Sequence, residues 1–309
     1  MKVLMTGSAS PLGAALLHTL AADERIEQII GLDSKETTYS GPRFTQVVLD
    51  VRSPQVTRIM ARLDAVVHVA SAAALDSDSA RRDPALFNDL TVHAAQNIIL
   101  SALEHSLRCV VHLSSAAVYA LPPRQRPITE QHPCAALPGF AWAEGLVQVE
   151  EWLDTLSLVE SDSRLVRLRP ALIVGRGASP RVESLLNAMF AIGLAGRPPR
   201  LNCVHVDDVA SAIRQALFHK DVHGVFNLGC ANAATLTEMQ RLRGRGFVPL
   251  PFALIYHLRR LARYFGRDSE PAWMEAFRHE LVLDSSRARR RLGWKPRYDT
   301  VESCLTAAD

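Results

Sequence analysis

Short apolar runs alternate with longer amphipathic stretches over the first half of the chain. The apolar runs lie at residues 3–5, 29–32, 46–49, 65–69, 109–113 and 165–168, and helical patterns cover 12–22, 87–105 and 141–156. Strands that are apolar on both faces are typical of parallel sheets with helices on both sides. With right-handed crossovers, this alternation predicts an α/β fold with a doubly wound parallel sheet.

The pattern becomes less regular after Pro170. Residues 178–200 and 241–280 are rich in proline, arginine and aromatic side chains, and no internal repeat or low-complexity linker separates them from the first half. We therefore expect a nucleotide-binding domain over residues 1–170. Residues 171–309 are expected to form mainly a smaller C-terminal substrate lobe, interleaved with strands that return to the main sheet.

Composition excludes several classes of protein. The net charge is only +3, and no basic block points to nucleic acid. No apolar run of ~18 residues predicts a membrane span, and the chain starts directly on a strand-like run without a signal peptide. The five cysteines are scattered without C-x-x-C spacing. This pattern favours reduced thiols in a cytoplasmic protein and argues against a disulfide framework or a metal site.

A glycine-containing turn follows the first apolar run. Gly7 permits a tight turn, Gly13 permits close packing of helix on strand, and Ser10 replaces the middle glycine of the usual pattern. Pro11 and Leu12 open the next helix, whose backbone N–H groups and dipole suit a pyrophosphate. The Ser10 side chain could either crowd the pyrophosphate or hydrogen-bond to it.

Three further strand ends carry residues that suit a dinucleotide. Asp33 ends the second run, twenty residues after Gly13, where a carboxylate accepts hydrogen bonds from both adenosine ribose hydroxyls and repels a 2′-phosphate. NAD is therefore favoured over NADP, although Lys35 moderates that preference. Asp50, with Val51 beside it, is placed to contact the adenine amino group. The small residues Ala70, Ser71 and Ala72 leave room for a flat cofactor over the sheet edge.

With these residues the chain resembles the extended short-chain dehydrogenases/reductases, in the NAD-dependent epimerase/dehydratase group, which have a Rossmann fold. The resemblance covers nearly the whole length. Its other motifs are Ser114–Tyr119, Pro127–Glu130, Leu168–Pro170, Val174–Gly177, His205–Ala210, Asp284–Ala288 and Leu292–Trp294. Each motif is moderately specific, but their order and spacing together are strong. The resemblance places Pro170 beside the nicotinamide.

The same resemblance shows what the chain lacks. Active relatives use a serine, a tyrosine and, four residues after the tyrosine, a lysine that holds the nicotinamide ribose and lowers the pKa of the phenol. Ser115 matches the serine, but Phe140 and Glu144 stand at the tyrosine and lysine positions. A phenyl ring has no proton to give, and a carboxylate cannot lower a neighbouring phenol's pKa. The family's usual asparagine is Thr91 here.

Other groups are candidates for the missing proton transfer. Tyr119 lies four residues past Ser115, although the family commonly uses this tyrosine for packing, and Glu144 can act as a base if it is buried. Glu144 can equally point to solvent or contact a ribose hydroxyl, and Phe140 can still pack against the nicotinamide. His205 is expected in a structural role, and His68 and His112 in the core or at strand ends.

Three hypotheses of function remain open at this stage. The first is an NAD-dependent oxidoreductase or isomerase with a non-standard proton route, and the second is a non-catalytic NAD(H)-binding sensor or scaffold. The third, weaker hypothesis is a subunit that lends its fold to an active relative. The basic stretch 255–265 indicates a lid over an anionic small molecule, nucleotide-linked or acyl, or else an ordinary surface helix. Relatives commonly pair as homodimers through the helices at 87–105 and 141–156.

Overall fold

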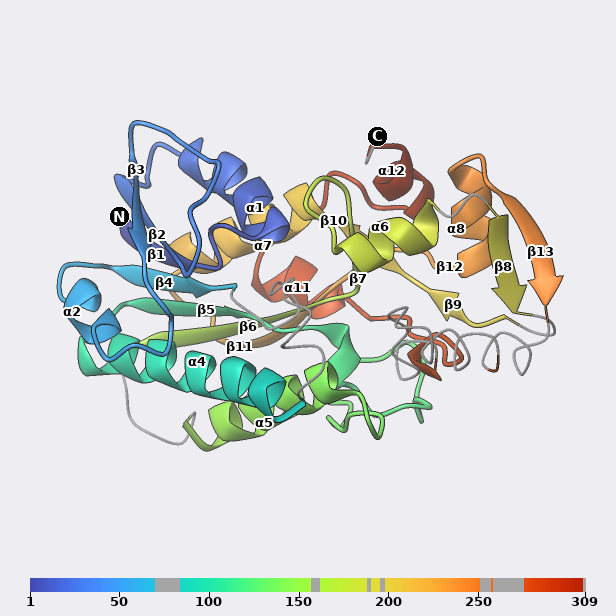
Figure 1. Cartoon of the computed structure of the whole chain (residues 1–309), viewed down its shortest axis with the longest axis horizontal. Coiled ribbons are helices and arrows are strands. Elements are labelled where there is room, and N and C mark those ends of the chain that lie inside the picture. The colour runs from blue at the N-terminus through green and yellow to red at the C-terminus, as the bar shows by residue number, and fades with distance from the viewer. Residues whose placement is uncertain are drawn as a thin grey trace.

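The computed structural model describes residues 1–69, 84–156, 162–187, 190–194, 198–250, 257 and 275–307. Seven parallel strands form its central sheet, in the order β11-β6-β5-β4-β1-β2-β3 (Figure 1). The strands are β1 (Lys2–Thr6), β2 (Gln28–Asp33), β3 (Phe44–Val48), β4 (Ala65–His68), β5 (Cys109–Leu113), β6 (Arg164–Pro170) and β11 (Gly224–Leu228). The predicted doubly wound α/β fold is confirmed.

Helices cover both faces of this sheet, as Figure 1 shows. One face carries α1 (Pro11–Ala21) and α7 (Val206–Phe218), and the other carries α2 (Val56–Met60), α4 (Pro84–Glu104) and α5 (Ala141–Leu156). Successive side chains of a strand point to opposite faces. Within β1, Val3 and Met5 therefore pack in the core beneath α1 and α7, while Leu4 packs in the core on the other face, beneath α2, α4 and α5.

The sheet has a topological switch point between β1 and β4. The chain runs outward from β1 to β2 and β3, then crosses back so that β4 pairs with the other side of β1. In open α/β sheets, ligands bind in the crevice beyond the carboxyl ends of the strands at such a point. Thr6 and His68 end β1 and β4 there, and their side chains are joined by a 2.9 Å hydrogen bond.

A smaller lobe is built from the later part of the chain. It contains β7 (Leu172–Val174), α6 (Pro180–Leu186), β8 (Phe190–Leu194), β9 (Arg200–Leu201), β10 (Cys203–His205), β12 (Ala234–Thr235), α8 (Leu236–Leu242), β13 (Gly246–Leu250) and α12 (Val301–Thr306). Its strands form the pairs β10-β7, β12-β9 and β13-β8. The helix α11 (Ser286–Arg291) packs near β11, which lies late in the sequence yet belongs to the main sheet.

A buried ion-pair network fastens α5 to the sheet. The Glu150 carboxylate on α5 accepts hydrogen bonds from Arg167 and Arg169 of β6, each with a shortest distance of 2.8 Å. Burial opposes ionisation, but the two guanidinium groups outweigh it and lower the pKa of Glu150 to about 2. The helix that should carry the family's tyrosine and lysine is therefore held firmly in place.

Candidate cofactor and ligand site

The turn after β1 is closed by its own hydrogen bonds. The Ser10 hydroxyl donates to the Gly7 carbonyl at 2.7 Å and accepts from the Gly13 N–H at 2.9 Å. It thus caps α1 from within the turn. A Cβ on Gly13 would lie 1.9 Å from the Gly7 oxygen, so only glycine fits there. Both of these hydrogen bonds lie within the protein, and the two alternatives for Ser10, crowding a pyrophosphate or hydrogen-bonding to it, stay predictions.

A second loop braces the start of α1 from the lobe side. Gly177 follows β7 with φ +88°, and a Cβ there would lie 2.4 Å from the carbonyl oxygen of Pro11. Backbone therefore meets backbone at this contact, which only a glycine permits. The family motif at residues 174–177 thus adjoins the first helix.

Asp33 lies where a ribose-binding carboxylate is expected. Its two oxygens accept hydrogen bonds from the backbone N–H groups of Ala9 at 3.0 Å and Lys35 at 3.2 Å. These bonds fix the carboxylate against the turn that precedes α1. A carboxylate can accept about four hydrogen bonds, so this geometry leaves acceptor capacity for ribose hydroxyls.

Asp50 and Val51 lie beyond β3, near the helices of the second face. Arg52 forms a 2.7 Å ion pair with Asp50, and its hydrogen bond is the main reason that the pKa of Asp50 is lowered. The Val51 carbonyl accepts a hydrogen bond from the Asn97 amide at 2.6 Å. Contacts with Arg52 and Asn97 therefore shape this loop, and its contact with an adenine stays a prediction. Ala70, Ser71 and Ala72 lie outside the described residues.

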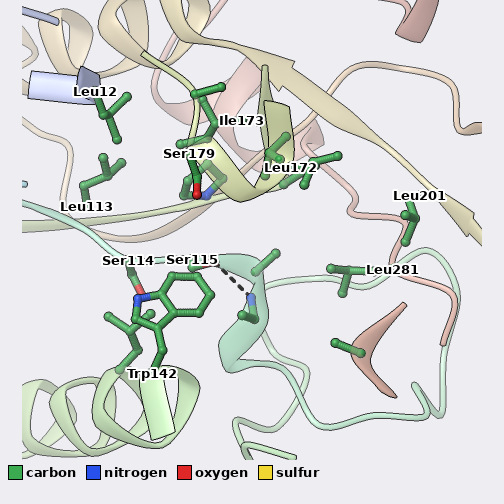
Figure 2. A pocket seen from close by; sticks show the side chains of 18 of the residues that line it. Leu12, Leu113, Ser114, Ser115, Trp142, Leu172, Ile173, Ser179, Leu201 and Leu281 are labelled. Atoms are coloured by element: carbon green, nitrogen blue, oxygen red, sulfur yellow. Dashed lines mark hydrogen bonds between the residues drawn. The ribbon is translucent and has the colours of Figure 1, made fainter. Parts of the chain in front are cut away.

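A cavity of about 230 Å³ opens beside Ser115, between the main sheet and the lobe (Figure 2). The main domain contributes Ser10, Pro11, Leu12, Ser115 and Pro170, and the lobe contributes Leu172, Ile173, Ser179, Leu201 and Leu281, among others. Ser115 begins the 3-10 helix η2 (Ala116–Val118), where its hydroxyl accepts a hydrogen bond from the Ala117 N–H at 3.2 Å. The turn, the serine and Pro170 thus line one cavity, as expected for a shared cofactor and ligand site.

Phe140 forms part of the cavity wall, just before α5. Its ring is only 2% exposed and lies 5.6 Å from the ring of Trp142, measured between centroids. Figure 2 shows Trp142 reaching from α5 towards Ser114 and Ser115. The sequence reading missed Trp142, although its place two residues after Phe140 was a signal that the start of this helix faces the site.

Glu144 lies one helical turn after Phe140, and its side chain forms a hydrogen bond with the backbone. Its carboxylate accepts a 2.9 Å hydrogen bond from the Gly139 N–H, and the side chain does not line the described cavity. An acidic group in the first turn of a helix also interacts favourably with the helix dipole. This position gives Glu144 a capping role at the start of α5.

Tyr119 lies in the interior, away from the lining of the cavity. Its hydroxyl donates to the Asn227 side chain at 2.6 Å, and the residue is 1% exposed. Burial raises the pKa of Tyr119 far above its usual value, which Arg169 only partly offsets. The hydroxyl is thus held in the core, where the family's packing use of this tyrosine places it.

The three histidines of the sequence analysis lie in structural surroundings. His205 caps α7, where its Nδ1 accepts the Asp207 N–H at 3.2 Å. His68 and His112 stack at the ends of β4 and β5, with ring centroids 5.4 Å apart. Burial lowers the pKa of His112 to about 4 and that of His68 well below its usual value, so both rings are neutral at pH 7.

Three cysteines that look unconnected in the sequence meet in the core of the lobe. The sulfur atoms of Cys203, Cys230 and Cys304 all lie within 4.8 Å of one another, and all three residues are buried. They come from β10, from the segment after β11 and from α12. This cluster could not be predicted from the sequence, because the three cysteines lie far apart along the chain. The three pack among apolar side chains, in the manner of small hydrophobic residues.

Comparisons with known proteins agree with this architecture. The family model described as NAD-dependent epimerase/dehydratase family matches residues 3–229, and the chain belongs to that family. An uncharacterised protein of Mycobacterium tuberculosis is 26% identical over 97% of this chain and 81% of its own length. A UDP-glucose 4-epimerase of Mycolicibacterium smegmatis is 27% identical over 98% of this chain and 96% of its own.

Solved structures share the fold over the whole chain. A UDP-glucose 4-epimerase of Thermotoga maritima, solved with UDP-glucose, has a TM-score of 0.75 at 19% identity, covering 100% of this chain and 97% of its own. The protein MoeE5, solved with UDP-glucose and NAD, has a TM-score of 0.77 at 16% identity and the same coverage. At such identities the likeness shows the fold. Among the described helices, none combines the length and the apolar character that crossing a bilayer requires.

Proposed function

We propose that the protein is an NAD(H)-binding member of its family that has kept the cofactor site and a ligand cavity but lost the family's proton-transfer pair. The observation that carries this proposal is the wall beside Ser115. Phe140 fills the tyrosine position there, while Glu144 bonds to Gly139 and Tyr119 to Asn227. Among the described residues that line the cavity, none has a carboxylate, imidazole, phenol or amine. A cofactor-dependent sensor or scaffold is the function that fits best.

The residues present fit a dinucleotide. The start of α1 behind the Gly7–Gly13 turn would hold the pyrophosphate, and the Asp33 carboxylate would accept the ribose hydroxyls. Asp33 favours NAD, because a 2′-phosphate would bring like charge against the carboxylate. When bound, the nicotinamide supplies a hydride acceptor or donor. The residues of this chain would bind and orient it, and Phe140, in the wall of the same cavity, would cover that end.

A second candidate is an oxidoreductase or isomerase with a different proton route. Ser115 favours it, since its hydroxyl lies in the cavity where it can donate to a ligand carbonyl. A substrate oxygen could then exchange its proton through Ser115 with water. Loss of a general acid or base typically lowers a rate by ~10²–10⁴, so such an enzyme would be slow.

The ligand is proposed to be a small molecule, with an anionic group on it as an alternative that the described cavity lining, without a charged side chain, does not favour. The basic stretch 255–265 supports that alternative through its composition alone, because all but one of its residues lie outside the described part of the chain. Pairing of two copies through α4 and α5 is likewise a prediction, which the mass measured by light scattering tests.

Cofactor binding is tested first, by thermal unfolding with NAD, NADH, NADP and no addition. A ligand at 100 times its Kd stabilises a protein by about 2.7 kcal/mol, so NAD and NADH should raise Tm and NADP should raise it less. The absence of a shift with any dinucleotide would sink both candidate functions.

The double variant Phe140→Tyr with Glu144→Lys separates the two candidates. We expect no hydride transfer in the unmodified protein, with NADH oxidation or NAD reduction appearing only when both groups are restored. Phe140→Tyr with Glu144→Gln is the matched control, because it supplies the phenol without the positive charge. Redox activity in the unmodified protein that disappears in Ser115→Ala would establish the rerouted enzyme instead.

A further inference from the structure

Hydrocarbon side chains form most of the wall of the cavity beside Ser115. Aliphatic groups from both parts of the molecule face one another across it, as Figure 2 shows for Leu12, Leu113, Leu172, Ile173, Leu201 and Leu281. Aromatic rings from Phe140, Trp142 and Phe277 extend the same surface. The two sides meet around Ser115, where the family's chemistry would take place.

Two polar side chains of this wall form hydrogen bonds within the protein. The Asn202 amide donates to the carbonyls of Cys230 and Leu283 and accepts the Leu283 N–H, all at 3.2 Å. Ser10 is committed to its own turn. The other hydroxyls in the lining belong to Ser114, Ser115 and Ser179, and the described lining includes no charged side chain.

We propose that the group bound beside Ser115 is a hydrocarbon skeleton with a single ketone or secondary alcohol, and not a polyhydroxylated sugar ring. The inference rests on the proposed function, since it names the ligand of the same cavity. Apart from Ser114, Ser115 and Ser179, the described aliphatic and aromatic lining offers few partners, so most hydroxyls of a sugar ring would give up water without a replacement, which opposes binding. One oxygen placed at Ser115 keeps its hydrogen bond, and the hydrocarbon remainder gains from burial.

The replacement of tyrosine by phenylalanine agrees with this ligand class. At the tyrosine position, the Phe140 ring leaves the cavity wall without a phenol hydroxyl, and the Trp142 indole ring lies beside it. The position that lost its chemistry thus became part of an apolar binding surface.

A homologous series of methyl ketones tests the proposal. Binding of 2-hexanone, 2-heptanone, 2-octanone and 2-nonanone to the full-length protein with saturating NAD is measured by calorimetry, with UDP-glucose as the polar comparator. We expect Kd to fall roughly fourfold per added methylene until the cavity is filled. UDP-glucose is expected to bind more weakly than the longest ketone. A series without slope, no binding by any ketone, or tighter binding of UDP-glucose overturns the proposal.

Variants locate the effect in this cavity. Leu172→Asn and, independently, Leu281→Asn place an amide in the wall and should weaken 2-nonanone at least tenfold. Either one suffices if the other does not fold. Leu242→Asn is the matched control, because Leu242 is 42% exposed and lies outside the cavity, so ketone binding should not change. Unchanged ketone binding in both wall variants would contradict the assignment. The NAD-induced Tm shift, read in the same samples, shows whether the proposed function fails or only the ligand class.

Discussion

The turn between β1 and α1 and the start of α5 contribute to the same cavity, but they differ in what they have kept. In the turn, the Ser10 hydroxyl accepts the Gly13 N–H, and the backbone is packed so tightly that a Cβ on Gly13 would lie 1.9 Å from the Gly7 carbonyl oxygen. At the start of α5, the helix and its anchor at Glu150 are intact, while Phe140 and Glu144 replace the chemical groups. The cofactor turn depends on backbone shape, whereas the family's chemistry depends on two side chains.

This difference shows how binding and reaction can separate within one fold. Backbone geometry at a turn tolerates few substitutions, because any side chain at a crowded glycine must displace main-chain atoms. The start of α5 can lose the family's chemical groups without loss of the helix, because Glu150 anchors the helix further along its length. Function must therefore be argued from the site and not from the family's fold.

The largest effect is expected from Gly13→Val. The new side chain would collide with the Gly7 carbonyl, so we expect a loss of about 3 kcal/mol or more in unfolding free energy and no Tm shift with NAD. Gly139→Ala is the control from the other region. Its φ of +76° costs about 1–2 kcal/mol, but no atom lies within 4 Å of the added carbon. A normal NAD shift in Gly13→Val would break the comparison.

Glu150→Gln should come next. It removes the carboxylate that pairs with Arg169 and the buried one of the two that pair with Arg167, and removal of one partner from a buried ion pair costs about 3–5 kcal/mol. Urea unfolding measures the loss, and the exposed neighbour in Glu151→Gln should change stability by less than about 0.5 kcal/mol. Equal stability of the two variants would show that α5 is not anchored in this way.

The buried histidines His68 and His112, stacked at the ends of β4 and β5, predict a pH dependence. Burial lowers the pKa of His112 to about 4 in the folded protein. In the unfolded chain the same imidazole binds a proton at about pH 6.5, so acid favours the unfolded state. Stability therefore falls as pH drops, by about 2 kcal/mol between pH 7 and pH 5 for His112 alone, and His68 acts in the same direction. Unfolding titrations should show a shallower slope for His112→Leu, and an unchanged slope would refute the assignment.

Asp33→Asn tests the proposed ribose-binding carboxylate, and its expected effect is smaller than those above. The amide keeps an acceptor for the Ala9 N–H but loses the negative charge, so NADP should gain roughly tenfold relative to NAD. Calorimetric titration with both cofactors provides the ratio. If discrimination stays as in the unmodified protein, Asp33 does not contact the ribose.

Glu144→Gln should have the smallest effect. The amide oxygen can still accept the Gly139 N–H, so only the interaction of the charge with the helix dipole is lost, about 0.3–1 kcal/mol. NAD binding should not change. A large loss of any measured activity in this variant would instead make Glu144 a base and remove the contrast between the two regions.

The sequence predicted the sheet and the cofactor turn because both follow from local patterns. Apolar runs give the strands directly, and Gly7, Ser10 and Gly13 stand at fixed spacing within one turn. The third strand begins at Phe44, two residues before the expected run, because Phe44 pairs with Ile29 across the sheet. Pairing of this kind depends on distant residues, so local pattern locates strand ends poorly.

The side-chain partners could not be predicted in the same way. Tyr119 finds Asn227 more than a hundred residues away, and the cluster formed by Cys203, Cys230 and Cys304 exists only once the lobe is folded. The replacement of the tyrosine and lysine by Phe140 and Glu144 is what the family resemblance implies from the distance to Ser115, and it stays a prediction. What Phe140 does instead required the cavity, whose walls come from both parts of the molecule.

The wall of the cavity that Ser10, Pro11 and Leu12 form links the proposed cofactor site with the proposed ligand site. Ser10, Pro11 and Leu12 line the cavity while belonging to the turn that would hold the pyrophosphate, and the Gly177 loop presses on the same turn from the lobe. Two molecules bound against one shared wall form a thermodynamic cycle. If the bound dinucleotide changes the affinity for the apolar ligand by some factor, the bound ligand must change the affinity for the dinucleotide by the same factor. A protein without turnover can report the redox state of its nicotinamide through such reciprocity, if NAD and NADH differ in that factor.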